Sequence, residues 1–129
     1  MKFVIVLAAA AAIAAPAALA CDDGGPPVNL LATPAVKAGL TAAYAAAHPS
    51  TRVAGPAPGR TWYGRHEGYE FAVATFGAHP SVFSRSPGGR WHLDRDTHGA
   101  VCANLVPVAL LAATWSYGHW ARQCYVEPR

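Results

Sequence analysis

The chain carries little charge, since only 13% of its 129 residues are Asp, Glu, Lys or Arg. Such a low charged fraction excludes a coiled coil and a long solvated acidic or basic tail. The formal net charge is only +3, and the arginines are scattered, which excludes the basic balance of a nucleic-acid-binding protein. Beyond residue 20 no apolar run is long enough to cross a bilayer. A length near 130 residues predicts one small domain.

Motifs of the common enzyme classes are also missing. The chain contains neither a G-x-S-x-G nor an S-x-x-K serine-nucleophile motif. It has no G-x-G-x-x-G dinucleotide motif and no P-loop, and none of its His and Cys spacings matches a zinc signature. The sequence therefore predicts no cofactor and gives no positive indication of an enzyme.

The first 20 residues have the organisation of a secretory signal peptide. Lys2 supplies one positive charge, residues 3–15 are apolar throughout, and Pro16 interrupts any helix. Small residues at Ala18 and Ala20 occupy the positions before a cleavage site. We therefore predict a signal peptide over residues 1–20 and an exported protein, either secreted or held in the cell envelope.

The three cysteines have different predicted roles. Export permits disulfides, and a bridge between Cys102 and Cys124 would close a loop of about 23 residues. Cys21 stands first in the mature chain, where a bacterial lipoprotein carries its acyl group. The preceding residues depart from the usual lipoprotein pattern, because Ala18 stands where leucine is common. Acylation of Cys21 and a free or intermolecular thiol both remain open, and we expect membrane contact only with acylation.

Proline and glycine divide the mature chain into a lead-in and a domain. Residues 21–32 begin with Asp22-Asp23-Gly24-Gly25-Pro26-Pro27, which predicts a flexible lead-in. Residues 33–129 form the predicted single α+β domain. It opens with a helix over Ala35–Ala47, because Thr33 is a suitable N-cap and Pro34 suits the first helical turn.

A β-hairpin follows the helix in the sequence. The segments Thr61–His66 and Tyr69–Phe76 are rich in strand-forming residues and flank the dipeptide Glu67-Gly68. A two-residue connection places Arg65 opposite Glu70, so we expect a surface ion pair between them. The residues expected on the core face are Trp62, Tyr69, Phe71 and Val73.

A second hairpin is predicted from Ser81–Arg85 and Arg90–Asp94, joined by the turn residues 86–89. A four-residue connection places Val82 and Leu93 on one face together with Trp91. Phe83 and His92 would then lie on the opposite face. The hairpins together predict an antiparallel meander.

A second helix is predicted over Val108–Tyr117, where apolar residues recur at helical spacing after Pro107. The expected order is therefore helix, four strands, helix. This order predicts an α+β fold with two layers: a four-stranded antiparallel meander with one helix before and one after it. One sheet face would then pack on the helices, and the other would be polar.

Two sets of residues are candidates for a functional site. Tyr63 would lie on the polar sheet face, and an exposed aromatic residue among arginines is typical of a binding surface. That binding set is Tyr63, Arg65, Arg85 and Arg90. The alternative is a metal-dependent or hydrolytic site, because strand alternation would place His92, Asp94 and Asp96 on one side.

Two stretches of the chain share a pattern with known proteins, and together they cover about half of the chain. The residues that carry this pattern are Gly55-Pro56, Pro58-Gly59, Trp62-Tyr63-Gly64-Arg65, Tyr69–Phe76, Val82-Phe83, Gly89-Arg90-Trp91, Asp96-Thr97, Gly99 and Cys102. With these residues the chain resembles a group of small, uncharacterised exported proteins of bacteria with GC-rich genomes. The resemblance implies a small, exported single domain and no particular activity; the group tends to have glycine where His98 stands.

These observations favour a non-catalytic exported domain that binds an unknown protein or envelope partner, because no catalytic motif is present. A secreted protein inhibitor is one specific form of this hypothesis, by analogy of fold with cystatin-like and β-lactamase-inhibitory-protein-like architectures. The alternative is a small metal-dependent or hydrolytic enzyme that uses the His92, Asp94 and Asp96 set.

Overall fold

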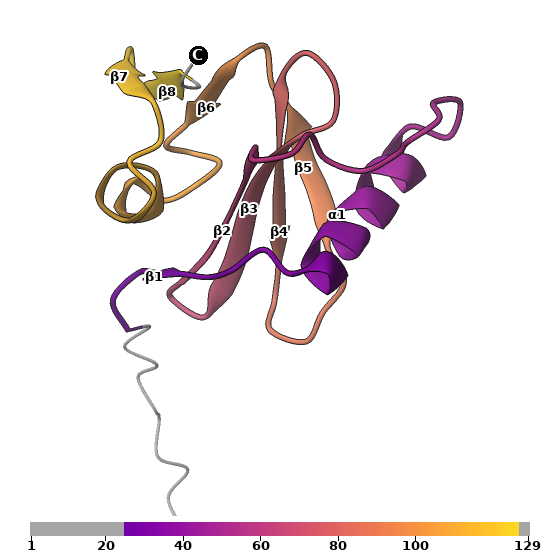
Figure 1. The fold of residues 1–129 in the computed structure, drawn as a ribbon. Coiled ribbons are helices and arrows are strands. Elements are labelled where there is room, and N and C mark those ends of the chain that lie inside the picture. The colour runs from indigo at the N-terminus through magenta and orange to yellow at the C-terminus, as the bar shows by residue number, and fades with distance from the viewer. Residues whose placement is uncertain (1–24, 127–129) are drawn as a thin grey trace, which may run out of the picture.

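The computed structural model describes residues 25–126, so the predicted signal peptide and Cys21 lie outside the described residues. Within these residues the fold is mixed α+β, with one α-helix, a five-stranded antiparallel sheet and a separate three-stranded sheet (Figure 1). The larger sheet has the order β1-β2-β3-β4-β5. Its strands are β1 (Val28–Asn29), β2 (Thr61–His66), β3 (Tyr69–Thr75), β4 (Pro80–Arg85) and β5 (His92–Asp96).

Helix α1 (Pro34–Ala47) forms where the sequence predicts it. The Thr33 hydroxyl accepts a hydrogen bond from the Val36 amide at 3.3 Å, which satisfies one of the open N–H groups of the first turn. The helix ends at His48, whose amide donates to the Tyr44 carbonyl oxygen at 3.0 Å. Leu40 is fully buried and fixes the face of α1 that packs on the sheet.

The first hairpin has the register that the sequence predicts. Arg65 pairs with Glu70, and His66 pairs with Tyr69. Both turn residues have positive φ, 49° at Glu67 and 77° at Gly68, as a two-residue turn between twisted strands requires. The prediction of this register from turn length alone is therefore confirmed.

The register predicted for the second hairpin is wrong by one residue. β5 begins at His92, which pairs with Ser84, so the connection is longer than four residues. Phe83 therefore pairs with Leu93, and a bulge interrupts the ladder beyond that pair. A shift of one residue moves every side chain to the other face. Trp91 accordingly packs with Phe83, on the side of the sheet that faces α1.

The lead-in is not wholly flexible as predicted. Val28 and Asn29 form β1 at the edge of the sheet, opposite Arg65 and Gly64 of β2. The Leu30 amide continues the ladder by donating to the Tyr63 carbonyl oxygen at 2.9 Å. The meander of β2 to β5 thus gains a fifth, two-residue strand, because the backbone of β2 still offers unpaired groups at its outer edge.

Both faces of the larger sheet are covered, so the expectation of one polar face is wrong. Figure 1 shows α1 on one side of β2–β5 and the C-terminal segment on the other. The α1 side holds a cluster of Leu40, Tyr63, Ala72, Ala74, Phe83 and Trp91. The cluster on the opposite side consists of Val73, Val82, Val101, Val106, Leu110, Leu111, Trp115 and Tyr117.

The C-terminal segment differs from the single helix predicted over 108–117. It contains a short π-helical turn, η1 (Ala109–Thr114), in which the Trp115 amide donates to the Leu110 carbonyl oxygen five residues earlier at 2.8 Å. A three-stranded sheet of order β6-β8-β7 accompanies it. Its strands are β6 (Ala100–Cys102), β7 (His119–Ala121) and β8 (Cys124–Val126).

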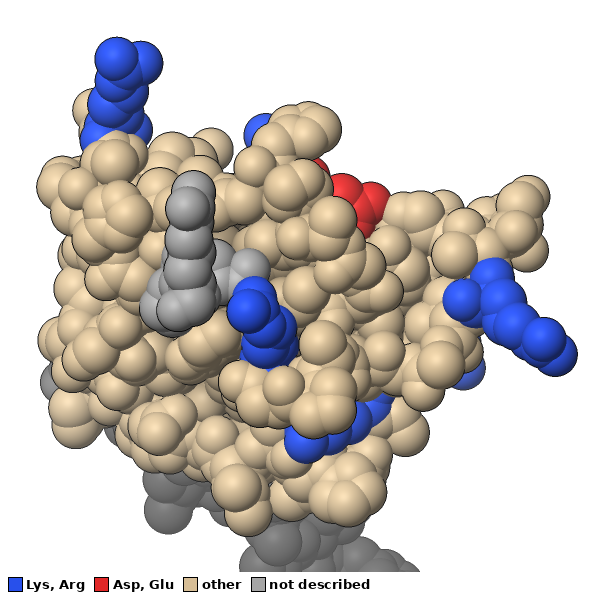
Figure 2. Space-filling view, turned by 45° about the horizontal axis from the view of Figure 1, so that its top comes forward, with Lys and Arg blue, Asp and Glu red and all other residues tan. Residues whose placement is uncertain are grey.

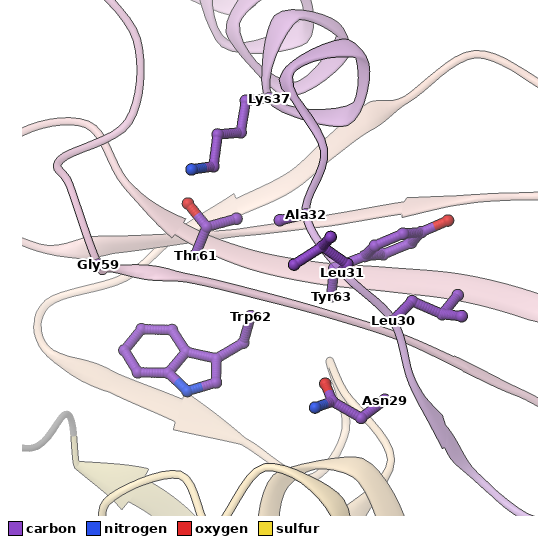
Figure 3. Close-up of a pocket in the computed structure, with 9 residues that line it drawn as sticks. All are labelled: Asn29, Leu30, Leu31, Ala32, Lys37, Gly59, Thr61, Trp62 and Tyr63. Atoms are coloured by element: carbon purple, nitrogen blue, oxygen red, sulfur yellow. The ribbon is translucent and has the colours of Figure 1, made fainter.

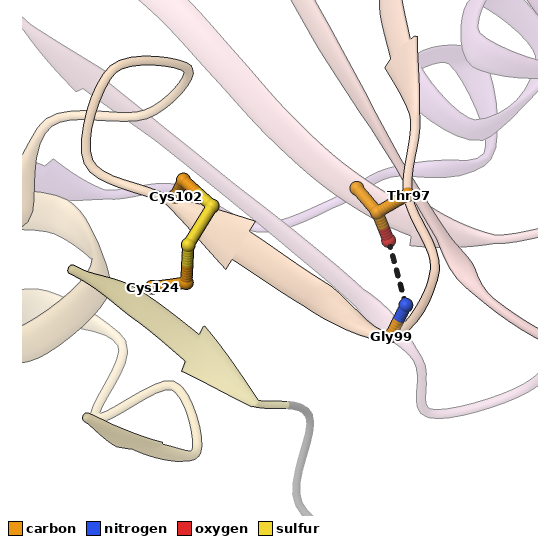
Figure 4. The surroundings of a disulfide bond; sticks show 4 residues. All are labelled: Thr97, Gly99, Cys102 and Cys124. Atoms are coloured by element: carbon orange, nitrogen blue, oxygen red, sulfur yellow. Dashed lines mark hydrogen bonds between the residues drawn. A yellow bond between two sulfur atoms is a disulfide. The ribbon is translucent and has the colours of Figure 1, made fainter. Parts of the chain in front are cut away.

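The predicted disulfide between Cys102 and Cys124 is present and joins β6 to β8 (Figure 4). The two cysteines face each other directly in the ladder. The tail therefore runs antiparallel to β6. Upstream of β6, the Thr97 hydroxyl accepts a hydrogen bond from the Gly99 amide at 3.3 Å, which shapes the turn between β5 and β6.

Candidate functional site

A buried carboxylate lies at the centre of the side of the sheet that faces α1. Glu70 on β3 is opposite Arg65 of β2 and Arg85 of β4, so the three side chains form a row across three strands. Tyr63 on β2 donates its hydroxyl to Glu70 Oε1 at 2.8 Å, and Arg65 Nη2 donates to the same oxygen at 2.9 Å. Arg85 Nε donates to Oε2. Each carboxylate oxygen therefore has a partner.

The electrostatics of this row favour an ionised carboxylate. Burial by itself would raise the pKa of Glu70, but the hydrogen bonds from Arg65, Arg85 and Tyr63 outweigh it and hold the pKa below the ordinary value. Burial, and then the hydrogen bond to Glu70, raise the pKa of the Tyr63 hydroxyl. Both groups thus keep their charge states over the neutral pH range.

Three of the four predicted binding residues belong to this row, but not in the way expected. Tyr63 is only 7% exposed, so its predicted exposure on a polar face is wrong. Glu70 is 4% exposed, so the pair that it forms with Arg65 is not the surface ion pair expected from the register. Since α1 covers this face, Tyr63, Arg65 and Arg85 act first as the hydrogen-bonding partners of a buried acid.

A groove lies beside this row, between α1 and the β4–β5 hairpin. Its cavity volume is about 480 Å³, which falls within the usual range for small-molecule pockets. We name it the Arg–Trp groove. The residues that line it are Gly39, Ala42, Ala43 and Ala46 of α1 together with Arg85, Gly89, Arg90 and Trp91 of the hairpin. Two of the four predicted binding residues, the arginines of β4 and of the hairpin connection, therefore meet at this groove.

Trp91 is the largest side chain of the Arg–Trp groove, and it is held from three sides. The Arg85 guanidinium carbon lies 4.4 Å from the centre of the indole ring, and the Tyr63 ring meets the indole edge-on at 5.7 Å. On the third side α1 approaches so closely that a Cβ at Gly39 would lie 2.7 Å from Trp91 Cδ1. Glycine at this position therefore permits the contact between helix and indole.

One polar atom of Trp91 has no partner. The indole Nε1 is buried and has no hydrogen-bond acceptor among the residues that the structure describes, while the whole side chain is 93% buried. Nε1 lies on the edge of the ring that faces Gly39, at the wall of the groove. A buried N–H without an acceptor lowers the free energy of unfolding, and this indole nitrogen is a hydrogen-bond donor that the described residues leave unpaired.

Arg90 differs from the other two arginines because it has no ion-pair partner within residues 25–126. It is exposed at the mouth of the Arg–Trp groove, whereas Arg65 and Arg85 both bind Glu70. No acidic side chain among residues 25–126 lines this groove. The local field is therefore positive, with Arg90 as the unneutralised charge.

The structure does not bring His92, Asp94 and Asp96 together on one side. The bulge in β5 breaks the alternation, so His92 lies opposite Ser84 and Asp96 lies opposite Ser81, on different sheet faces. Asp96 is already engaged: Ser81 Oγ donates to one oxygen at 2.6 Å, and His48 Nε2 lies 2.7 Å from the other. Within residues 25–126, no three His, Cys, Asp or Glu side chains gather in a way that could hold a metal ion.

A second opening lies where the lead-in crosses β2 (Figure 3). Its volume is about 400 Å³. Figure 3 shows the Lys37 side chain extending from α1 towards Thr61, with the Trp62 ring farther from the helix. Leu31 at the rim of the opening is 82% exposed. Among the described residues, Lys37 is the single charged residue that lines this opening, so the opening concentrates less charge than the Arg–Trp groove.

The molecular surface has no extended basic face in the view of Figure 2. Lys and Arg side chains lie apart from one another there, and most of the surface is uncharged. Within residues 25–126, no helix is both long and apolar enough to cross a membrane. On the face shown in Figure 2, positive charge is therefore local rather than spread over an extended surface.

Sequence reasoning missed several residues of the Arg–Trp groove. Strand alternation placed Trp91 on one sheet face with Val82 and Leu93, and the alanines of α1 were predicted as part of the helix without a groove beside them. A signal was nonetheless present, because Gly39 interrupts a strong helix-forming segment and the small residues recur at helical spacing after it. Comparison of the chain with protein-family models, with curated proteins and with solved structures gave no match.

Proposed function

We propose that this protein is an exported, non-catalytic binding protein that holds a small ligand in the Arg–Trp groove. The observation that carries the proposal is the groove itself, where Arg90, Arg85 and Trp91 converge on a concave site without an acidic lining residue. Concave sites with a few convergent polar groups are the usual form of ligand pockets. A small molecule suits this shape better than the protein or envelope partner expected from the sequence, which would require a larger and flatter surface.

The state of Glu70 supports a binding role rather than catalysis. A general acid or base needs a pKa near the working pH and access to the reacting group. Glu70 has the opposite properties, because its pKa is lowered and both of its oxygens accept hydrogen bonds from neighbouring side chains. Its role in the proposed protein is to hold Arg85 against Trp91.

The enzyme alternative built on His92, Asp94 and Asp96 has less support. The bulge places the first and last of these residues on different faces of the sheet, and Asp96 is engaged by Ser81 and His48. A single catalytic centre would need these groups within reach of one substrate. The secreted-inhibitor hypothesis rests on analogy of fold alone and has no separate support in the described residues.

Export remains part of the proposal. The predicted signal peptide over residues 1–20 motivates it, and a disulfide between Cys102 and Cys124 is consistent with an oxidising extracellular compartment. The resemblance to small exported proteins of GC-rich bacteria points the same way. Intact-mass measurement on the chain produced by an exporting bacterial host tests this part. A mass that begins at Cys21 supports it, and a mass that begins at Met1 contradicts it. An added diacylglycerol would place the protein in the envelope.

Binding and catalysis are separated by one experiment on the exported protein. The protein is incubated with a cellular metabolite extract, and the extract is profiled by mass spectrometry before and after incubation. Compounds that co-elute with the protein in rapid gel filtration are then identified. The proposal predicts a retained compound in at most stoichiometric amount and no change in the rest of the extract. Depletion of one compound in many-fold excess over protein, with appearance of another, would contradict a non-catalytic role.

A further inference from the structure

We propose that the Arg–Trp groove binds an amphiphilic carboxylate, with the carboxylate beside Arg90 and an apolar body between Trp91 and the alanines of α1. This inference rests on the proposed function and names the chemical class of its ligand. It is carried by two features of the groove that are independent of one another: the unpaired charge and the composition of its walls.

The charge selects the head group. Arg90 is exposed and has no ion-pair partner among the described residues, whereas the Arg85 charge is shared with Glu70. One uncompensated guanidinium matches one carboxylate, which it can bind through two parallel N–H donors. A phosphate dianion would leave excess negative charge in the groove, so a monoanion fits the local charge better.

The helix wall selects the body of the ligand. The α1 residues that line the groove are one glycine and three alanines, so this wall offers methyl groups and no hydrogen-bonding side chain. Across from it lies Trp91, held in place by the Arg85 guanidinium at 4.4 Å from the ring centre. An alkyl or aryl body between these surfaces would be transferred out of water, and the burial of its apolar surface is the main driving force for such binding.

The indole N–H of Trp91 is a buried donor beside the helix wall, without an acceptor among the described residues. Trp91 Nε1 is buried, lacks an acceptor within residues 25–126 and faces the groove wall at Gly39. The side chain is 93% buried, so water does not compensate for the missing bond. A ligand oxygen could reach this donor only if α1 moved away from the indole edge, because a Cβ at Gly39 would already lie 3.3 Å from Nε1. In the arrangement that the structure describes, the donor open to an anionic head is the Arg90 guanidinium.

Octanoate is a direct probe of this proposal, with octanol as its neutral counterpart and inorganic phosphate as an anion without an apolar body. Binding to the exported protein is measured by calorimetry, and the indole N–H signals are followed by NMR, with Trp91→Phe used for assignment. We expect saturable binding of octanoate, at least tenfold weaker binding of octanol, and no saturation by phosphate. The Trp91 N–H signal should shift on binding, because this ring lines the groove.

Matched variants locate the site. Arg90→Gln removes the free charge, and Ala46→Leu fills the groove from an exposed position on α1, so neither should disturb the fold. Each should weaken octanoate binding at least tenfold. The controls are Arg95→Gln, an exposed arginine of β5 outside the groove, and Ala38→Leu, an exposed alanine of α1 that does not line it. Both controls should bind octanoate as the unchanged protein does.

The outcomes separate this inference from the proposed function. Equal binding of octanol, saturation by phosphate, or unchanged octanoate binding in Arg90→Gln and Ala46→Leu would overturn the carboxylate site. If octanoate fails to bind while another compound is retained from the metabolite extract, the inference fails and the proposed function stands. If the extract shows turnover, the proposed function fails whatever the result with octanoate.

Discussion

Replacement of Glu70 by Gln tests whether the row of Tyr63, Arg65 and Arg85 is held together by the carboxylate charge. The variant keeps the side-chain volume and one acceptor oxygen, but it leaves two guanidinium groups without their counter-ion. Loss of one partner from a buried ion pair costs about 3–5 kcal/mol when the remaining charge stays dry.

The expected cost here is smaller, because the arginines are not fully dry. The Arg65 side chain is 49% exposed and can regain water, so its loss is small. The Arg85 side chain is 23% exposed and lies over Trp91, so its charge is only partly rehydrated. We therefore expect Glu70→Gln to lower the free energy of unfolding by about 2–3 kcal/mol at pH 7, measured by urea denaturation.

Glu67→Gln is the matched control, because the Glu67 side chain is 74% exposed in the adjoining turn and should change stability by less than about 0.5 kcal/mol. The pH dependence gives a second test. The pKa of Glu70 is lowered in the folded protein, so its contribution is present above the ordinary carboxyl pKa and is lost as pH falls through the lowered value. The difference between the unchanged protein and Glu70→Gln should therefore shrink in acid. Equal stability of the two proteins at pH 7 would refute a structural role for the charge.

Three further outcomes are expected. Gly64→Ala should lower the free energy of unfolding by about 1–3 kcal/mol, measured by urea denaturation. The added Cβ would lie 2.8 Å from a backbone oxygen of β1 and 2.8 Å from a side chain of η1. An unchanged free energy of unfolding would show that these contacts relax freely. Peptide mapping without reductant should find Cys102 and Cys124 in one linked fragment. Cys124→Ser should lower the free energy of unfolding by about 2–5 kcal/mol. Free reaction of both thiols with maleimide would contradict the disulfide. The hydrogen bond to the Tyr44 carbonyl, and then that to Asp96, raise the pKa of His48 against the effect of burial. The contribution of His48 to folding stability is therefore complete below the ordinary imidazole pKa and is lost as pH rises through the raised value. An NMR titration that places the pKa of His48 at or below the ordinary value would refute the pairing.

The two hairpins show what the sequence could determine about the fold. The first connection is two residues long, and both of its residues accept positive φ, so only one register fits. The second connection contains glycines and a proline that suit several lengths, and a bulge in β5 adds a further offset. Turn chemistry alone did not choose among these lengths, and the error of one residue moved Trp91 from one sheet face to the other.

The candidate site was harder to foresee, because strand alternation identifies two faces without saying what covers each one. Phe71 and Val73 marked an apolar face, and that side does pack on the C-terminal segment. The opposite face of β3 carries Ala72 and Ala74, which the sequence did not mark as part of a buried face. Their size is what lets α1 approach the sheet and bury Tyr63. Such a contact depends on chain segments far apart in sequence, which local patterns do not report.

The bridge between β6 and β8 also affects how the protein would respond to peptidases. Positions 102 and 124 enclose η1, whose Leu110 and Leu111 cover one face of the larger sheet. A single peptide-bond cleavage anywhere between the two cysteines would produce two chains that remain covalently joined. The cleaved C-terminal segment could then stay docked on the sheet, and the fragments would separate only after reduction. In a compartment rich in peptidases, this linkage would let the domain tolerate a nick in the very segment that covers its core.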